Sequence, residues 1–349
     1  MTTKTAPKTA KGNFFEDFKV GQELVHATPR TVTDGDVALY TALTGSRFVV
    51  QSSAAFARSA GLKGAPVDDL LTFHVVFGKT VPDVSLNAVA NLGYAQGRFH
   101  KLVAPGTTLS TVSTVIGLKE NSNKETGTVY VRSTGRDDLG DLVLDYCRWV
   151  MVRKRDKASP APEAVVPELA PVVTPDFLTV PAGLDLSSFD TALSGSPHLW
   201  DDYAVGEKID HVDGMTIEEA EHMMATRLYQ NTARVHFNQF TEKDGRFGRR
   251  LMYGGHIISL ARALSFNGLG NAVFVAAING GRHAAPTFAG DTVFAWSEVK
   301  DKAEIEGRKD VGALRIRTLA TKNLPCADFP ESGENVVLDF DYWVLIPRR

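Results

Sequence analysis

The side chains best suited to chemistry in this sequence are an amide and an imidazole placed five positions apart, at Asn231 and His236. A histidine with its ordinary pKa of about 6.5 can both accept and donate a proton near neutral pH. Asparagine cannot take up a proton, but its amide can orient a water molecule or a substrate oxygen. The pair therefore indicates general base catalysis by His236, with Asn231 as an orienting residue.

Two consecutive glycines, Gly254 and Gly255, precede His256 and an apolar segment with helical spacing. The segment carries Ile257, Leu260, Ala261 and Leu264 at positions i, i+3, i+4 and i+7. Glycine allows a ligand to approach the backbone closely, and free N–H groups at the start of a helix favour negative charge. We therefore expect an oxygen that becomes negative during a reaction to bind at this helix start.

The elements that must position these residues occur twice in the chain. Residues 143–155 and 337–349 align with six identities in thirteen positions, including Asp145 with Asp339 and Trp149 with Trp343. Shorter matches join residues 18–21 to 203–206. A single long repeat of this kind indicates duplication of one domain, rather than a short-period repeat protein.

Each copy combines one apolar helical segment with several strand-like runs. The helical segments lie near residues 70–77 and 257–264. The strand-like runs are rich in Val, Thr, Tyr and Trp, and they cover residues 109–117, 126–133, 141–153, 292–298, 312–321 and 336–346. One helix followed by an antiparallel sheet predicts an α+β protein, and a sheet wrapped around a helix is the hotdog architecture. Two copies predict a double hotdog.

A proline-rich stretch separates the two copies. Six of the sixteen prolines lie between Pro160 and Pro181, where missing backbone donors and fixed φ angles favour an extended connector. We predict a disordered tail at 1–13, an N-terminal hotdog domain at 14–155, a linker at 156–199 and a C-terminal hotdog domain at 200–349.

Composition excludes several classes of function. The net charge of −3 over 349 residues offers no basic excess for nucleic acid. No uncharged apolar run is long enough to cross a membrane, and the N-terminal residues lack the apolar core of a secretion signal. The two cysteines, Cys147 and Cys326, can form neither a disulfide framework nor a cysteine metal cage. We expect a cytoplasmic protein without a metal site.

Residues 231–236 and 253–256 carry a resemblance to the MaoC-like hydratases, and it extends over both halves of the chain. Those enzymes carry the motif Asp-x-Asn-Pro-x-His, followed further on by His-Gly and a central helix. Here Asn231 stands at the acidic position, and His236 is kept. In the first half, Ser46 and Gln51 stand at the acidic and histidine positions, so that half is interpreted as a degenerate copy.

The resemblance implies a hydro-lyase that adds water reversibly to an α,β-unsaturated CoA thioester, with no cofactor beyond the CoA of the substrate. It implies His236, Asn231 and Gly255 as catalytic residues, with the Gly255 N–H binding the thioester oxygen. A carboxylate elsewhere could complete the pair with His236, and Asp68 and Asp69 are the candidates.

Longer strings, such as residues 77–87 and 227–237, narrow the implied reaction to hydration of mesaconyl-CoA to β-methylmalyl-CoA in acetyl-CoA assimilation of the ethylmalonyl-CoA pathway type. That substrate has a free carboxylate, which a guanidinium can bind with two hydrogen bonds. Arg234 is the first candidate for this role, and Arg227 and Arg282 are alternates. Gly254 and His256 are further candidates for substrate binding.

Three other functions remain compatible with the sequence. The chain could hydrate a different enoyl-CoA, act as a hotdog thioesterase, or bind CoA without catalysis. A thioesterase needs a carboxylate to activate water, which Asn231 cannot replace, and an inactive module would not need His236. Because exposed hotdog sheets can pair, we also expect a homo-oligomer.

Overall fold

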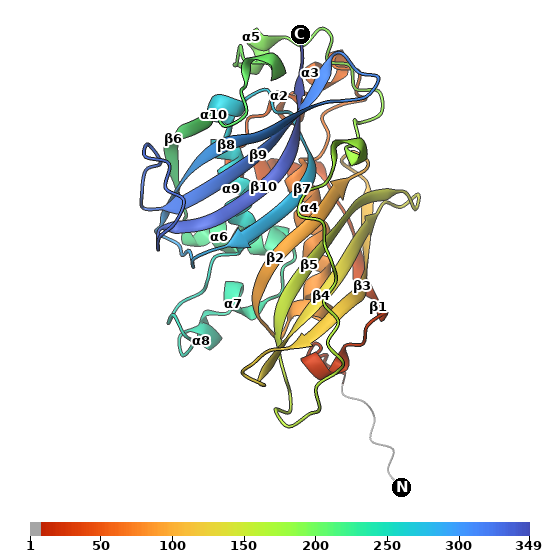
Figure 1. The fold of residues 1–349 in the computed structure, drawn as a ribbon, viewed down its shortest axis with the longest axis vertical. Coiled ribbons are helices and arrows are strands. Elements are labelled where there is room, and N and C mark those ends of the chain that lie inside the picture. Colours follow the sequence, from red (N-terminus) through yellow and green to blue (C-terminus); the bar gives the residue numbers. More distant parts are fainter. Residues whose placement is uncertain (1–7) are drawn as a thin grey trace.

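The computed structural model describes residues 8–349 and shows a single ten-stranded antiparallel sheet (Figure 1). The strands are arranged in the order β1-β3-β4-β5-β2-β7-β10-β9-β8-β6. Their bounds are β1 Glu23–Thr31, β2 Ala88–Phe99, β3 Thr108–Glu120, β4 Thr126–Arg136, β5 Leu142–Arg153, β6 Lys208–Thr216, β7 Phe274–His283, β8 Thr292–Glu304, β9 Val311–Lys322 and β10 Val336–Pro347.

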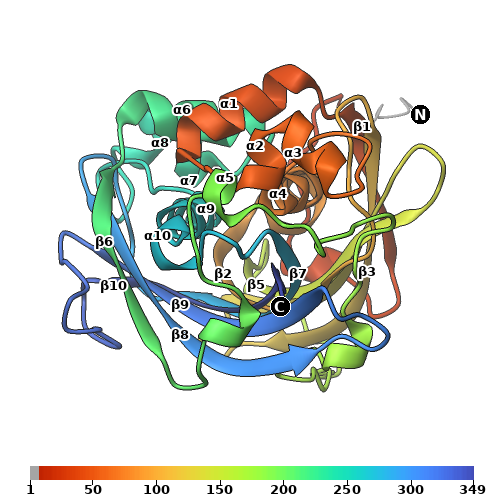
Figure 2. The ribbon, with the colours of Figure 1, turned by 90° about the horizontal axis from the view of Figure 1, so that it is seen from above.

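The sheet curls around two central helices, α4 and α9, and the remaining longer helices cover these from the other side (Figure 2). The helix bounds are α1 Asp34–Thr44, α2 Val49–Ser52, α3 Ala54–Ser59, α4 Asp69–Thr80, α5 Thr191–Ser194, α6 Glu219–Leu228, α7 Arg234–Phe237, α8 Gln239–Glu242, α9 Gly254–Leu264 and α10 Phe266–Leu269. Short turns occupy η1 Phe15–Asp17, η2 Val81–Ser85, η3 Pro175–Phe177 and η4 Trp200–Asp202. The predicted α+β double hotdog is therefore confirmed.

The two repeats meet at the middle of the sheet. Strand β2 of the first repeat pairs antiparallel with β7 of the second, so that Tyr94 lies opposite Gly281 and Arg98 opposite Ala277. Strands β1–β5 fall within the predicted domain at 14–155, and β6–β10 within that at 200–349. The sheet is thus continuous across both repeats, and any residue on β2 or β7 lies at the boundary between them.

Both predicted central helices are present, and their residues explain why they lie inside. All twelve residues of α4 are buried, and Asp68 caps it by accepting a hydrogen bond from the Leu70 N–H. Helix α9 is buried from Gly255 to Leu264. Apolar side chains of both helices belong to one core cluster, so the two repeats share a core instead of each enclosing its own.

The connector between the repeats is ordered along the sheet. Val165 forms an isolated bridge with Leu118, and the Val173 carbonyl accepts a hydrogen bond from the Trp343 indole at 2.9 Å. Of the predicted tail, residues 1–7 lie outside the described residues. Asn13 already donates a side-chain hydrogen bond to the Asp83 carbonyl, so the last part of that segment packs against the fold.

Candidate active site

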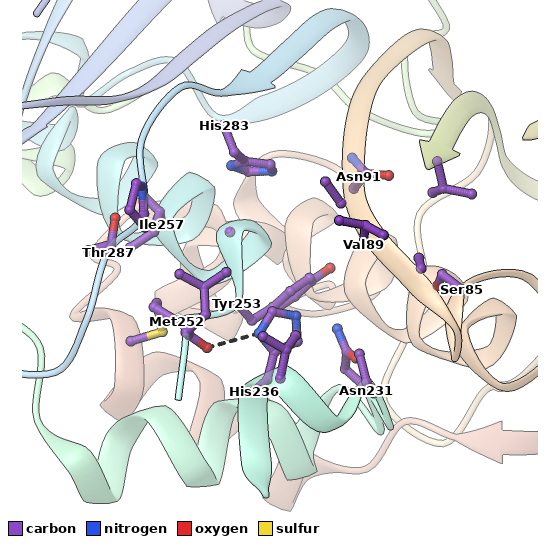
Figure 3. Close-up of a pocket in the computed structure, with 18 of the residues that line it drawn as sticks. Ser85, Val89, Asn91, Asn231, His236, Met252, Tyr253, Ile257, His283 and Thr287 are labelled. Atoms are coloured by element: carbon purple, nitrogen blue, oxygen red, sulfur yellow. Dashed lines mark hydrogen bonds between the residues drawn. The ribbon is translucent and has the colours of Figure 1, made fainter. Parts of the chain in front are cut away.

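A cavity of about 340 Å³ lies between the two repeats (Figure 3). The second repeat lines it with the loop before α7, the start of α9 and the end of β7. The first repeat contributes the end of α4, η2, β2 and β5. The first repeat therefore supplies a complete wall of this cavity, although Ser46 and Gln51 replace its own motif residues.

His236 lies on α7 and lines the cavity. Its Nδ1 is 2.9 Å from the carbonyl oxygen of Leu251, and since a carbonyl can only accept, Nδ1 is the protonated nitrogen. This leaves Nε2 with a free lone pair. Burial lowers the pKa of His236 to about 4, so the ring is neutral at pH 7 and can act as a base.

Asn231 lies beside the His236 ring in the loop between α6 and α7 (Figure 3). Its side chain is buried, and Oδ1 accepts a hydrogen bond from the backbone N–H of Ala233 at 3.0 Å. This bond fixes the amide orientation and leaves the two Nδ2 hydrogens as its free donors. The residue can therefore donate to a water or a substrate oxygen in the cavity.

The start of α9 forms another part of the cavity wall, and Gly254 lines it. The first N–H groups of a helix have no partner within the helix and carry its positive end. Both glycines here are required by packing. A Cβ on Gly254 would lie 2.6 Å from the His283 ring, and one on Gly255 would lie 2.4 Å from the Tyr253 ring.

His283 and Arg148 are among the polar residues of the cavity that were not predicted from the sequence. His283 ends β7, and its Nε2 is 3.2 Å from the hydroxyl of Tyr94 on β2. Burial first, and then the nearby His236, lower the pKa of His283 to about 4. Arg148 lies on β5 and is almost fully buried. The repeat alignment pairs Arg148 with Tyr342, which shows that the position diverged but not that it faces a cavity.

Three predicted substrate-binding residues do not line the cavity. Arg234 and Arg282 are exposed. Arg282 points away from the cavity that its neighbour His283 lines, because successive residues of a strand point to opposite faces. His256 is buried, and its Nδ1 lies 3.1 Å from the Tyr229 hydroxyl. The structure therefore does not support the prediction that either arginine binds the substrate carboxylate.

No carboxylate lines the cavity among the described residues, and its charged residues are Arg148 and Arg246. Asp68 caps α4 near Arg262, and Asp69 accepts a hydrogen bond from the Val275 N–H at 2.9 Å. Neither carboxylate lines the cavity, which therefore contains two imidazoles, His236 and His283, and a positive charge balance. An anionic ligand fits this balance.

Within residues 8–349, no cluster of three or more His, Cys, Asp or Glu side chains could hold a metal ion. Over the same range, none of the helices combines the length and the apolar character that spanning a membrane requires.

Comparison with known proteins shows the family of this chain. The family model described as mesaconyl-CoA hydratase matches residues 2–326. The chain belongs to the mesaconyl-CoA hydratase family. It is 64% identical to a β-methylmalyl-CoA dehydratase of Chloroflexus aurantiacus over the full length of both chains, and 59% identical to a mesaconyl-CoA hydratase of Cereibacter sphaeroides over 98% of this chain and all of the relative.

Solved structures extend this family relationship to the fold. A MaoC domain dehydratase from Chloroflexus aurantiacus superposes with a TM-score of 0.96 at 64% identity, covering 99% of this chain and 100% of that one. A Mycobacterium tuberculosis protein with a double hotdog fold superposes with a TM-score of 0.78 at 27% identity, covering 96% and 98% of the two chains. The family membership and the double hotdog therefore rest on full-length matches.

Proposed function

We propose that this protein is a hydro-lyase that reversibly hydrates mesaconyl-CoA to β-methylmalyl-CoA. The observation that carries the proposal is the fixed, neutral imidazole of His236 in a cavity that also contains the Asn231 amide and the start of α9. The identity of 64% to a β-methylmalyl-CoA dehydratase supports this choice of substrate over other enoyl thioesters. The proposal retains the place in acetyl-CoA assimilation that the resemblance implies.

The chemistry follows from these three groups. The Asn231 amide orients a water molecule at the β-carbon of the thioester, and His236 Nε2 takes a proton from that water as it attacks. The thioester oxygen becomes negative, and the free N–H groups of Gly254 and Gly255 stabilise it at the positive end of α9. The His236 imidazolium then returns the proton to the α-carbon. The reverse sequence eliminates water.

A single imidazole that serves both proton transfers can do so only from one face of the substrate. The proposal therefore includes syn addition of water. It needs no cofactor, because CoA is part of the substrate. It also retains the cytoplasmic location and the homo-oligomer expected from the sequence, the latter being measurable by analytical ultracentrifugation of the full chain.

The direct experiment follows the loss of enoyl thioester absorbance when purified protein is mixed with mesaconyl-CoA or crotonyl-CoA, with the product identified by mass spectrometry. We expect hydration of mesaconyl-CoA with a much higher kcat/KM. Equal values for both substrates would instead identify a general enoyl-CoA hydratase. Release of free thiol would identify a thioesterase, and binding without turnover would identify an inactive CoA-binding module.

The pH dependence of kcat/KM provides a second test. Neutral His236 is the active form, and burial lowers its pKa to about 4, so activity should persist as the pH falls and be lost only near pH 4. An unperturbed histidine would already lose activity near pH 6.5. Buried neutral histidines also make the fold less stable in acid, so circular dichroism at each pH is needed to separate unfolding from titration. An acid limb near pH 6.5 on a folded protein would contradict the assignment.

A further inference from the structure

Arg148 is a buried cation in the wall of the cavity. It is 1% exposed and lies on β5. Its Nη2 donates to the hydroxyls of Thr80 at 2.7 Å and Ser85 at 3.3 Å, and its guanidinium carbon lies 4.3 Å from the centre of the Phe77 ring. Its Nε is buried without a hydrogen-bond partner, and Nη1 donates to no group among the described residues.

This guanidinium also lacks a counterion among the described residues. Within residues 8–349 no Asp or Glu forms an ion pair with it, and its hydrogen-bond acceptors are the uncharged hydroxyls of Thr80 and Ser85. Arg132, on the neighbouring strand β4, instead pairs with Asp145 at 2.7 Å. Burying an unpaired cation is costly, and proteins rarely accept the cost without a partner. The partner of Arg148 therefore has to come from outside the chain.

A second polar side chain without a partner lies close by in the same wall. Asn91 lines the cavity from β2, and both its Nδ2 and its Oδ1 are buried without a hydrogen bond (Figure 3). Strands β2 and β5 are adjacent in the sheet, where Asn91 lies opposite Val150 and Arg148 opposite Tyr94. Two neighbouring strands of the first repeat thus present unused donors to one cavity.

We infer that Arg148 binds the free carboxylate of the substrate and makes the site selective for the thioester of a dicarboxylic acid. This inference rests on the proposed function. A carboxylate can accept from the free Nε and Nη1 donors while replacing the missing counterion, and the Asn91 amide can add a further hydrogen bond. The cavity is thereby divided, since the second repeat holds the base and the oxyanion donors, and the first repeat holds the carboxylate site.

The position of Tyr94 connects the two parts. It lies opposite Arg148 on one side and opposite Gly281 of β7 on the other, and its hydroxyl contacts His283. A short dicarboxylic thioester can therefore extend across the β5–β2–β7 wall, with its thioester oxygen at α9 and its carboxylate at Arg148. This arrangement gives the first repeat a role in substrate binding, although Ser46 and Gln51 replace its own motif residues.

The test compares wild-type protein with Arg148→Met, using mesaconyl-CoA and crotonyl-CoA, which lacks the carboxylate. Loss of a buried charge-assisted interaction should reduce kcat/KM for mesaconyl-CoA by at least about a hundredfold relative to that for crotonyl-CoA. The melting temperature without substrate should stay the same or rise, because methionine removes an unpaired buried cation. Arg132→Met is the matched control, and it should lower the melting temperature without changing the substrate ratio.

Equal losses for both substrates, together with a lower melting temperature, would show that Arg148 is only structural and would overturn the inference. An Arg148→Met protein of unchanged stability whose ratio of kcat/KM for mesaconyl-CoA to that for crotonyl-CoA equals the wild-type ratio would also overturn the inference. If Arg148→Met does not fold, Arg148→Lys provides the test instead, because lysine keeps the positive charge but lacks the planar guanidinium that can bind a carboxylate with two hydrogen bonds. A selective loss of about tenfold for mesaconyl-CoA would then support carboxylate binding. Wild-type protein without activity on mesaconyl-CoA would refute the proposed function itself.

Discussion

His236→Ala is expected to lower kcat for mesaconyl-CoA hydration by about 10³-fold or more, within the upper range for removal of a general base. The reason is the absence of a substitute at that place. Among the described residues no carboxylate lines the cavity, and Asn231, the side chain next to the ring, cannot take up a proton. The second imidazole, His283, lies at the end of β7, where its Nε2 contacts the Tyr94 hydroxyl. The measurement is the initial rate of absorbance loss at saturating mesaconyl-CoA.

The fold should tolerate this substitution, because the side chain of His236 makes a single hydrogen bond, to the Leu251 carbonyl. Circular dichroism and the melting temperature check this directly. His198→Ala is the matched control, since His198 is exposed and lies outside the cavity lining. A folded His236→Ala protein that keeps more than about a tenth of the wild-type kcat would contradict the mechanism. The assignment of the base would then pass to His283, the other imidazole in the cavity.

The sequence predicts six of the ten strands, β3, β4, β5, β8, β9 and β10, because they are rich in β-branched and aromatic residues. It predicts neither the edge strands β1 and β6 nor the central pair, β2 and β7. The central pair contains several glycines. Those glycines reflect close packing at the junction of the repeats. A Cβ on Gly97 would lie 2.9 Å from the Ile278 side chain, which belongs to the facing strand. Such packing is long-range and leaves no local pattern.

The same limitation applies to the site. The motif at Asn231 and His236 is local, so its resemblance to known hydratases identifies it without a structure. Arg148 and His283 reach the cavity only because two strands from different repeats pair, which no local pattern reveals. The prediction of Arg282 missed the cavity by one position, because adjacent strand residues face opposite sides.

Duplication followed by divergence gives a consistent account of the cavity. An isolated repeat would have to bind both ends of a substrate with one set of loops. In the fused sheet, the second repeat keeps His236 and the two glycines, while the first repeat has exchanged its motif residues for Ser46 and Gln51 and carries Arg148 in the shared wall. Under the proposal above, the first repeat no longer needs a catalytic histidine, and its part of the wall instead binds the free carboxylate of the substrate.

Gly255→Ala is expected to lower kcat by about 10²- to 10³-fold, the range for loss of one oxyanion donor. A Cβ at this position would lie 2.4 Å from the Tyr253 ring. That ring cannot move freely, because it is buried and packs edge-on against the His236 ring, with centroids 5.5 Å apart. Relief of the clash must therefore shift either the N–H groups at the start of α9 or the base itself.

Helix propensity acts in the opposite direction, since alanine is favoured over glycine within a helix by about 1 kcal/mol. We therefore expect a modest change in melting temperature beside a large loss of kcat. Gly64→Ala is the matched control, because a Cβ there meets no atom within 4 Å, and its activity should equal that of the wild type. If Gly255→Ala were as active as Gly64→Ala, the start of α9 would not hold the thioester oxygen, and the negative charge would have to be stabilised by Asn231 or His283 instead.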